Sequence, residues 1–318
     1  MSSRTEIEPL PRTGMSNLNL YAVTVLIWGS TWLAIKYQLG IVPPAVSVVW
    51  RFGLSTAILL AYAMWKRLKL RFSAGEHFWI ALVGLSMFGI NYIAVYISEL
   101  YLASGLVAVI FSLIAVFNIV LMRVFYATPI KPAGLLGAVL GIAGVVLVFW
   151  PEVEQFSVAG NGLRGLVYAF VATIIASFGN IAATRTHRVG MQVVPMSAWA
   201  MMYGAIFVAI YAVFTGERFI FDTSFAYAAS LFYLALFGSV LAFGAYLTLM
   251  GRIGADRAGY TSVAIPIVAL LLSTLFEHLQ WQATMAAGIV LCVAGNVLVL
   301  MRRNRSRQLA PEGIRVPP

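Results

Sequence analysis

The chain has 318 residues, of which 61% are hydrophobic and only 10% are Asp, Glu, Lys or Arg. Soluble globular domains contain about 45–50% apolar residues, so this composition excludes an ordinary water-soluble enzyme and indicates a membrane protein. The formal net charge of +10 does not require a nucleic-acid partner, because basic loops also mark the cytoplasmic side of membrane proteins.

Apolar runs about as long as the ~20 residues that cross a bilayer as a helix follow one another along the chain. The third and fourth runs form one stretch that is too long for a single crossing, so we place a tight hairpin at Glu99 and residues 103–105. We therefore expect an all-α membrane protein with ten transmembrane helices. The runs are 19–38, 45–65, 77–98, 102–122, 132–150, 163–184, 195–214, 226–250, 257–276 and 281–301.

The basic residues alternate between the two sides of these spans. Seventeen of the 21 Lys and Arg lie in the two tails and in every second loop. The other side holds Lys36, Arg51, Arg164 and Arg218. The positive-inside rule then predicts that both termini lie in the cytoplasm, and we expect a multi-pass protein of the plasma (inner) membrane. Beside anionic lipid, the basic C-terminal tail needs no nucleic-acid partner.

The chain contains an internal repeat. The run GIAGVVLVF at 141–149 returns as CVAGNVLVL at 292–300, and Trp50 aligns with Trp199 in the more weakly matching front halves. A repeat with an odd number of spans must be inverted relative to its copy, as in many secondary transporters. We expect a tail at 1–18, a five-helix repeat at 19–150, a linker at 151–162, a second five-helix repeat at 163–301 and a basic tail at 302–318.

Small residues recur at helical spacing in the fifth and tenth spans. Gly137, Gly141 and Gly144 share one face, as do Gly288 and Gly295. Such faces let helices approach closely in lipid. They can serve packing within the chain or a homodimer, so the sequence leaves a monomer and a homodimer both open.

Metal and cofactor chemistry finds no support in the sequence. The single cysteine lies inside the tenth span, and the three histidines, His77, His187 and His278, fall in different loops. No metal-ligand cluster is therefore expected. No Gly-rich phosphate loop follows a strand, so we expect neither a nucleotide-driven pump nor a cofactor.

Several short strings, in order, resemble EamA-type transporters of the drug/metabolite transporter superfamily. The resemblance covers essentially the whole membrane portion, and it is the order and spacing of the strings that is specific. The strings are Trp28-Gly29-Ser30, Ile35-Lys36, Pro43-Pro44, Arg51-Phe52, Ser98-Glu99, Ser104-Gly105-Leu106, Ile253-Gly254-Ala255, Ala264-Ile265-Pro266 and Leu275-Phe276-Glu277.

The resemblance implies a ten-helix inverted-repeat carrier with a central cavity and no catalytic chemistry. It further implies that small polar or amphipathic metabolites, such as amino acids, are moved, often outward. The chain departs from the family pattern at Tyr126, where a glutamate is usual, and at Ala115, where a proline is frequent. Pro266 and Glu277 are retained, so a role for that pair is implied for the second repeat only.

Trp28, Trp32 and Lys36 recur every four residues and form one stripe on the first helix. Facing a cavity, they would offer aromatic walls and a cation for a carboxylate. Alternatively, the tryptophans pack in the core or face lipid, and the lysine extends to the interface.

A second group of candidates lies on the third span, where Asn91, Tyr92, Tyr96 and Glu99 occur. Intramembrane acids are functional by default, so Glu99 is a candidate to bind substrate or a coupling proton. The alternatives are an interhelical hydrogen bond for Asn91 and an interfacial position for Glu99.

The second repeat contributes Ser177 and Asn180 on one face of the sixth span, opposite the stripe of the first helix. These side chains could equally join helices. Pro266 interrupts the ninth span and frees a carbonyl for substrate or for bending. Glu277 and His278 follow at its outer end, where a pH-sensing pair or, more simply, an exposed helix end is expected.

The sequence as a whole favours a secondary transporter, acting as an exporter by alternating access, with a proton as a candidate coupling ion. Two alternatives stay open. A lipid-carrier translocase could use the same fold. A membrane-embedded enzyme would need acids or histidines clustered at one membrane face, and the 11 acids are scattered.

Overall fold

The computed structural model describes residues 15–130, 132–148, 150, 161–253, 258 and 261–308, and within them it contains helices and no strands. An apolar chain satisfies its backbone hydrogen bonds internally by forming helices, as the composition predicts. The elements are α1 (Asn17–Lys36), α2 (Pro44–Trp65), α3 (Ala74–Val83), η1 (Gly84–Ile90), α4 (Asn91–Glu99), α5 (Ser104–Phe111), α6 (Ile114–Tyr126), α7 (Pro132–Val148), α9 (Asn161–Arg188), α10 (Val193–Phe214), α11 (Phe225–Tyr233), η2 (Leu234–Leu241), α12 (Ala242–Ile253), α14 (Thr261–Phe276) and α15 (Ala283–Gln308).

Seven helical segments in the described part of the chain are long and apolar enough to cross a membrane. Three shorter apolar helices accompany them, at Gly134–Val148, Ala264–Phe276 and Ala283–Gly295. That ten helices cross the membrane stays a prediction. The seven long segments are Asn17–Lys36, Pro44–Trp65, Ala74–Glu99, Ser104–Tyr126, Gly162–Arg188, Val193–Phe214 and Phe225–Ile253.

The helices differ from the predicted runs mainly at their ends. The expected hairpin lies at residues 100–103, between α4 and α5. The sixth predicted run ends at residue 184, but α9 continues to Arg188 and keeps Arg185 and Arg188 in its last turn. Cations are stabilised at the C-terminal end of a helix, which accounts for the extra turn.

The ends of several helices follow from local sequence. Ser73 and Glu76 form a reciprocal capping box at the start of α3, which satisfies backbone N–H groups that have no partner in the helix. Beyond the last turns of α9 and α10, Gly190 and Gly216 adopt φ angles of +76° and +72°, a conformation that glycine adopts without strain.

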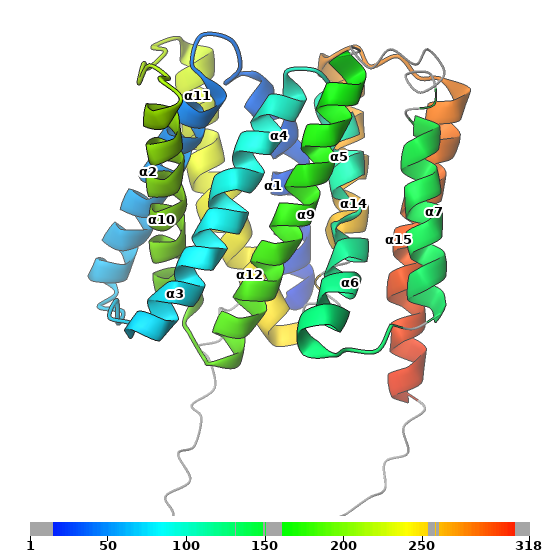
Figure 1. Cartoon of the computed structure of the whole chain (residues 1–318), viewed down its shortest axis with the longest axis horizontal. Coiled ribbons are helices and arrows are strands. Elements are labelled where there is room, and N and C mark those ends of the chain that lie inside the picture. Colours follow the sequence, from blue (N-terminus) through cyan, green and yellow to red (C-terminus); the bar gives the residue numbers. More distant parts are fainter. Residues whose placement is uncertain are drawn as a thin grey trace, which may run out of the picture.

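The helices stand side by side in one bundle (Figure 1). Helix α1 begins, and α15 ends, at the lower end of this view, which we call the terminal face; Lys36 lies at the opposite end, the far face. Helices α7 and α15 pair with each other at one side of the bundle.

The glycine faces of α7 and α15 make this pairing close. A Cβ atom at Gly288 would lie 2.5 Å from the carbonyl oxygen of Gly144, and one at Gly295 would lie 2.6 Å from that of Gly137. The Cys292 thiol donates a hydrogen bond to the carbonyl oxygen of Gly141, 3.3 Å away. The small residues of these two helices therefore serve packing within the chain.

Features of the first half recur about 150 residues later. Trp50 Nε1 donates to the carbonyl oxygen of Ile220 at 3.0 Å, and Trp199 Nε1 donates to that of Leu70 at 2.9 Å. The two contacts are reciprocal, because each tryptophan reaches into the other half. The only π-helical segments within the described residues, η1 and η2, also occupy corresponding positions.

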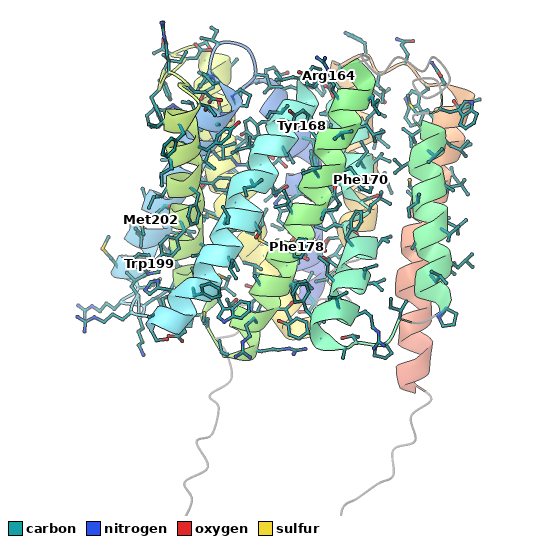
Figure 2. The ribbon with its side chains drawn as sticks, in the orientation of Figure 1. Arg164, Tyr168, Phe170, Phe178, Trp199 and Met202 are labelled. Atoms are coloured by element: carbon teal, nitrogen blue, oxygen red, sulfur yellow. The ribbon has the colours of Figure 1, made fainter. Side chains whose placement is uncertain are left out.

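The perimeter of the bundle is apolar. Tyr168, Phe170 and Phe178 project outward from α9 (Figure 2) and are each 38–41% exposed. Large apolar side chains on the outside are costly in water but favourable against lipid, which agrees with a bundle whose sides face the membrane.

Candidate functional site

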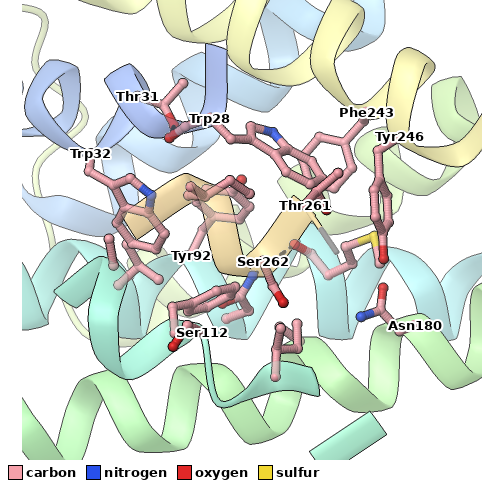
Figure 3. A pocket seen from close by; sticks show the side chains of 18 of the residues that line it. Trp28, Thr31, Trp32, Tyr92, Ser112, Asn180, Phe243, Tyr246, Thr261 and Ser262 are labelled. Carbon is pink, nitrogen blue, oxygen red and sulfur yellow. Dashed lines mark hydrogen bonds between the residues drawn. The ribbon is translucent and has the colours of Figure 1, made fainter. Parts of the chain in front are cut away.

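A cavity of about 100 Å³ lies in the middle of the bundle (Figure 3). Its lining contains aromatic, amide and hydroxyl side chains and no Asp, Glu, Lys, Arg or His among the described residues. The lining residues are Trp28, Thr31, Trp32, Ile35, Met87, Asn91, Tyr92, Val95, Ala108, Phe111, Ser112, Ile114, Ala115, Asn118, Ala176, Asn180, Phe243, Tyr246, Thr261, Ser262 and Ile265.

Helix α1 supplies one aromatic wall. Trp28 Nε1 donates to the carbonyl oxygen of Gly238 at 3.1 Å, and its ring lies 4.8 Å from that of Phe243 and 5.0 Å from that of Tyr246. Trp32 is only 8% exposed, and its Nε1 has no hydrogen-bond partner within the described residues. Since buried polar groups are normally paired, this N–H is available to an acceptor in the cavity.

The junction of η1 and α4 supplies two adjacent polar residues. Asn91 donates through Nδ2 to the carbonyl oxygen of Met87 at 3.2 Å, while its buried Oδ1 has no partner in the described part of the chain. Tyr92 lines the cavity with its ring against that of Phe52, 4.9 Å away. A π-helical turn is often found at functional sites, and η1 immediately precedes both residues.

The opposite wall is a small hydrogen-bonded group between α6 and α9. Asn118 Oδ1 accepts from Ser177 Oγ at 2.6 Å and from Asn180 Nδ2 at 3.3 Å. Asn180 and Asn118 line the cavity, whereas Ser177 lies behind them. From the sequence, Ser177 and Asn180 are candidate site residues, whereas Asn118, a lone polar residue in an apolar span, is expected to be structural; the structure places it in the cavity lining.

The Lys36 side chain is only partly exposed, and its ammonium group has partners within the protein. Its Nζ donates to the backbone carbonyl oxygen of Glu99 and, at 2.7 Å, to that of Leu102, and it lies 3.8 Å from Glu277 Oε1. Glu277 in turn accepts hydrogen bonds from the backbone N–H of Ser104, at 3.1 and 3.2 Å, and from its hydroxyl. We call Lys36, Glu277 and Ser104 the far-face junction.

This junction corrects the simpler expectation of an exposed end for Glu277. The Glu277 side chain is only 13% exposed, because it caps α5 from the neighbouring α14. A carboxylate at a helix N-terminus is favourable. His278 is exposed, as expected, so the two side chains do not act as a buried pair.

Glu99 ends α4 beside Lys36, but it is buried inside the protein. Its side chain is fully buried, and neither carboxylate oxygen has a hydrogen-bond partner among the described residues. The neighbouring Tyr96 donates its hydroxyl to Gln38 Oε1 at 2.7 Å. An unpartnered buried carboxyl is costly when charged, which makes Glu99 a candidate for holding a proton.

The structure thus divides the ten residues selected from the sequence into two groups. Trp28, Trp32, Asn91, Tyr92 and Asn180 line the cavity, and Lys36, Tyr96, Glu99, Ser177 and Pro266 do not. Pro266 lies within α14, directly after the lining residue Ile265.

The other lining residues differ in whether the sequence alone could have identified them. Thr31 lies three residues after Trp28 on the same face of α1, so helical spacing could have identified it. Phe111 lies on α5, and Phe243 and Tyr246 lie on α12. They look like ordinary residues of apolar helices, so only the packing of these two helices identifies them.

Comparison with known proteins adds the following findings. The model of the EamA-like transporter family matches residues 17–150 and 163–301. The chain is 26% identical over 282 residues to the uncharacterized inner membrane transporter YedA of Escherichia coli K12, covering 86% of this chain and 89% of that protein.

Proteins of two other organisms are also similar to this chain. The uncharacterized transporter YvbV of Bacillus subtilis is 25% identical over 321 residues, covering 97% and 98% of the two chains. An uncharacterized transporter of Archaeoglobus fulgidus is 24% identical over 298 residues, covering 89% and 98%. One solved crystal structure shares the fold with a TM-score of 0.68 at 19% identity, over 90% of this chain and 97% of that one.

Proposed function

Because the chain belongs to the EamA-like transporter family, we propose that it is a secondary transporter that exports small polar or amphipathic metabolites, such as amino acids and related compounds, by alternating access. It is a transporter and not an enzyme. The inner membrane is the proposed location, in keeping with the name of the Escherichia coli relative.

The observation that carries this proposal is the composition of the cavity wall. Aromatic rings from α1, α5 and α12 surround the space, and amide or hydroxyl groups from η1–α4, α6, α9 and α14 enter it. Small-molecule sites are mostly apolar with a few placed polar groups. Among the described residues, the lining has no clustered acids or histidines of the kind that a membrane-embedded hydrolase would need.

We also propose that ten helices form two inverted five-helix repeats, residues 19–150 and 163–301, with cytoplasmic termini. The reciprocal hydrogen bonds of Trp50 and Trp199 support this, because contacts of that kind are expected across a pseudo-two-fold axis. With this orientation, the far face is extracytoplasmic.

The far-face junction and Glu99 would then control transport. The far-face junction ties α1 of the first repeat to α14 of the second, so it closes the extracytoplasmic end of the site. Glu99 would bind the coupling proton. The charged groups that act on its carboxyl are Lys36, Glu277 and Arg51.

The proposal is tested by flux in membrane vesicles. Amino acids, purines, sugars and toxic analogues are screened by overexpression for altered tolerance, and the positive compounds are measured in vesicles with and without a pH gradient. Protein-dependent flux that a gradient accelerates is the expected result. Chemical turnover without net flux would favour an enzyme, and flux of lipid-linked substrates alone would favour a lipid-carrier translocase.

A matched pair of variants links the flux to the cavity. Trp32→Phe removes the unpaired N–H inside the cavity and is expected to lower flux, whereas Trp65→Phe alters a tryptophan that is 73% exposed and should leave flux unchanged. Equal flux in both variants would contradict the assignment of the substrate to this cavity.

A further inference from the structure

A buried cation stands directly behind the cavity wall. Arg51, on α2, is 1% exposed, although an uncompensated charge in a membrane interior is costly. Its Nε donates to Ser239 Oγ at 3.0 Å, and its Nη1 has no partner in the described part of the chain. No carboxylate oxygen of the described residues lies within ion-pair distance of its guanidinium, since the only such pair there joins Lys36 and Glu277.

The cation is held by two aromatic faces, one of which, that of Tyr92, belongs to a residue that lines the cavity. The guanidinium carbon lies 4.5 Å from the ring centre of Tyr92 and 5.3 Å from that of Phe52. Such contacts stabilise a cation without neutralising it. Gly238 packs between Thr31, which lines the cavity, and Arg51. A Cβ atom at Gly238 would lie 2.7 Å from Thr31 Cγ2 and 3.2 Å from Arg51 Nη2. Arg51 is therefore separated from the cavity by a single layer of residues.

Tyr92 contacts Arg51 and also lines the cavity. Its hydroxyl oxygen accepts a long hydrogen bond of 3.5 Å from Arg51 Nη2, so its own hydrogen is left to donate to another group. Hydrogen bonds polarise one another in sequence, and a donor backed by a cation favours an anionic acceptor. The unpaired N–H of Trp32 is a second donor in the same cavity.

No acidic side chain among the described lining residues would repel an anion. Glu99 is seven residues beyond Tyr92 on the same helix, about 10 Å away at 1.5 Å per residue, and it does not line the cavity. Asn91 Oδ1, an unpaired acceptor, can receive an N–H or O–H from the same ligand.

Building on the proposed function, we propose that the transported compounds carry a carboxylate, which the Tyr92 hydroxyl and Trp32 N–H bind under the field of Arg51, while an apolar or aromatic body lies against the rings of Trp28, Phe111 and Tyr246. Arg51 acts as a specificity-determining residue through Tyr92. The cavity selects organic acids over amines of the same skeleton.

The test uses three probes that share a phenyl body and differ in head group: phenylacetate, phenylacetamide and phenethylamine. Their affinities for the purified full-length protein in nanodiscs are measured by calorimetry. Phenylacetate is expected to bind about tenfold or more tightly than either of the others, since hydrogen bonds to a charged group are the strong ones.

Two variants locate the origin of this preference. Arg51→Met is expected to remove the preference for the acid. Tyr92→Phe keeps the ring and deletes the hydroxyl, and it should weaken phenylacetate about three- to tenfold with little effect on the amide. Tyr62→Phe, at a tyrosine that is 44% exposed, is the matched control. If Arg51→Met does not fold, Tyr92→Phe decides the question.

Three outcomes would overturn the inference: tighter binding of phenethylamine, equal binding of the three probes, or no binding of any of them. A folded Arg51→Met protein that keeps the preference for the acid would do so as well. None of these outcomes touches the proposed function, because vesicle flux of the compounds found by screening is measured separately.

Discussion

Replacing Lys36 by methionine should open the far face of the transporter. Methionine fills similar volume and removes the ammonium group alone. The lysine now joins α1 to the carbonyl oxygens of Glu99 and Leu102 and to the carboxylate of Glu277. In an alternating-access cycle, these contacts exist only while the far face is closed.

The magnitude follows from those contacts. A hydrogen bond to a charged group contributes about 1.5–3 kcal/mol, and the 3.8 Å ion pair, with side chains 27% and 13% exposed, adds at most about 1 kcal/mol. Because desolvation of the lysine offsets part of these contributions, we expect the closed state to lose about 2–4 kcal/mol of stability relative to the open state. At 1.4 kcal/mol per factor of ten, the open state should gain roughly 30- to 1,000-fold in population.

The assay measures access to the cavity from the extracytoplasmic side. Thr31→Cys places a thiol in the cavity lining, and Cys292→Ala removes the only native cysteine. The rate of labelling by a membrane-impermeant maleimide on intact cells reports the open population. Adding Lys36→Met should raise this rate by at least about tenfold.

The control is Lys69→Met, which removes an exposed lysine at the other end of the bundle and should leave the labelling rate unchanged. A folded Lys36→Met protein with an unchanged rate would refute the role of the junction in closure. Labelling of residue 31 from the cytoplasmic side alone would refute the proposed orientation.

Further predictions concern helix packing and coupling. Gly288→Ala should lower the free energy of unfolding by about 1–3 kcal/mol, since its Cβ would lie 2.5 Å from the carbonyl oxygen of Gly144. The control, Gly244→Ala, has no atom within 4 Å of its Cβ and should be neutral or slightly stabilising. Thermal unfolding of both proteins measures the difference, and equal destabilisation would contradict the prediction. Glu99→Gln should change the free energy of unfolding by no more than about 1 kcal/mol, because the Glu99 oxygens have no partner among the described residues. The same change should abolish the acceleration of flux by a pH gradient. Retained acceleration would exclude Glu99 as the proton site.

Much of this protein follows from its sequence. Apolar length alone indicates helices that cross a membrane, because lipid leaves the backbone no partners outside its own segment. Helical spacing placed Trp28 and Trp32 on one face, and both line the cavity. The glycines at positions 288 and 295 predicted close packing, and the structure supplies the partner helix.

Only the tertiary structure shows which helix faces contact each other, because sequence periodicity cannot predict these contacts. Spacing shows which residues share a helix face but not what that face meets, so it could not tell that Lys36 turns to Glu277 or that Asn118 joins the cavity wall. Arg51 is the clearest case: by sequence it is a charge near the end of a span, and only the packing of α2 against η2 and α4 buries it behind Tyr92. The reason is physical, since burial and pairing depend on contacts between segments that lie far apart in the chain.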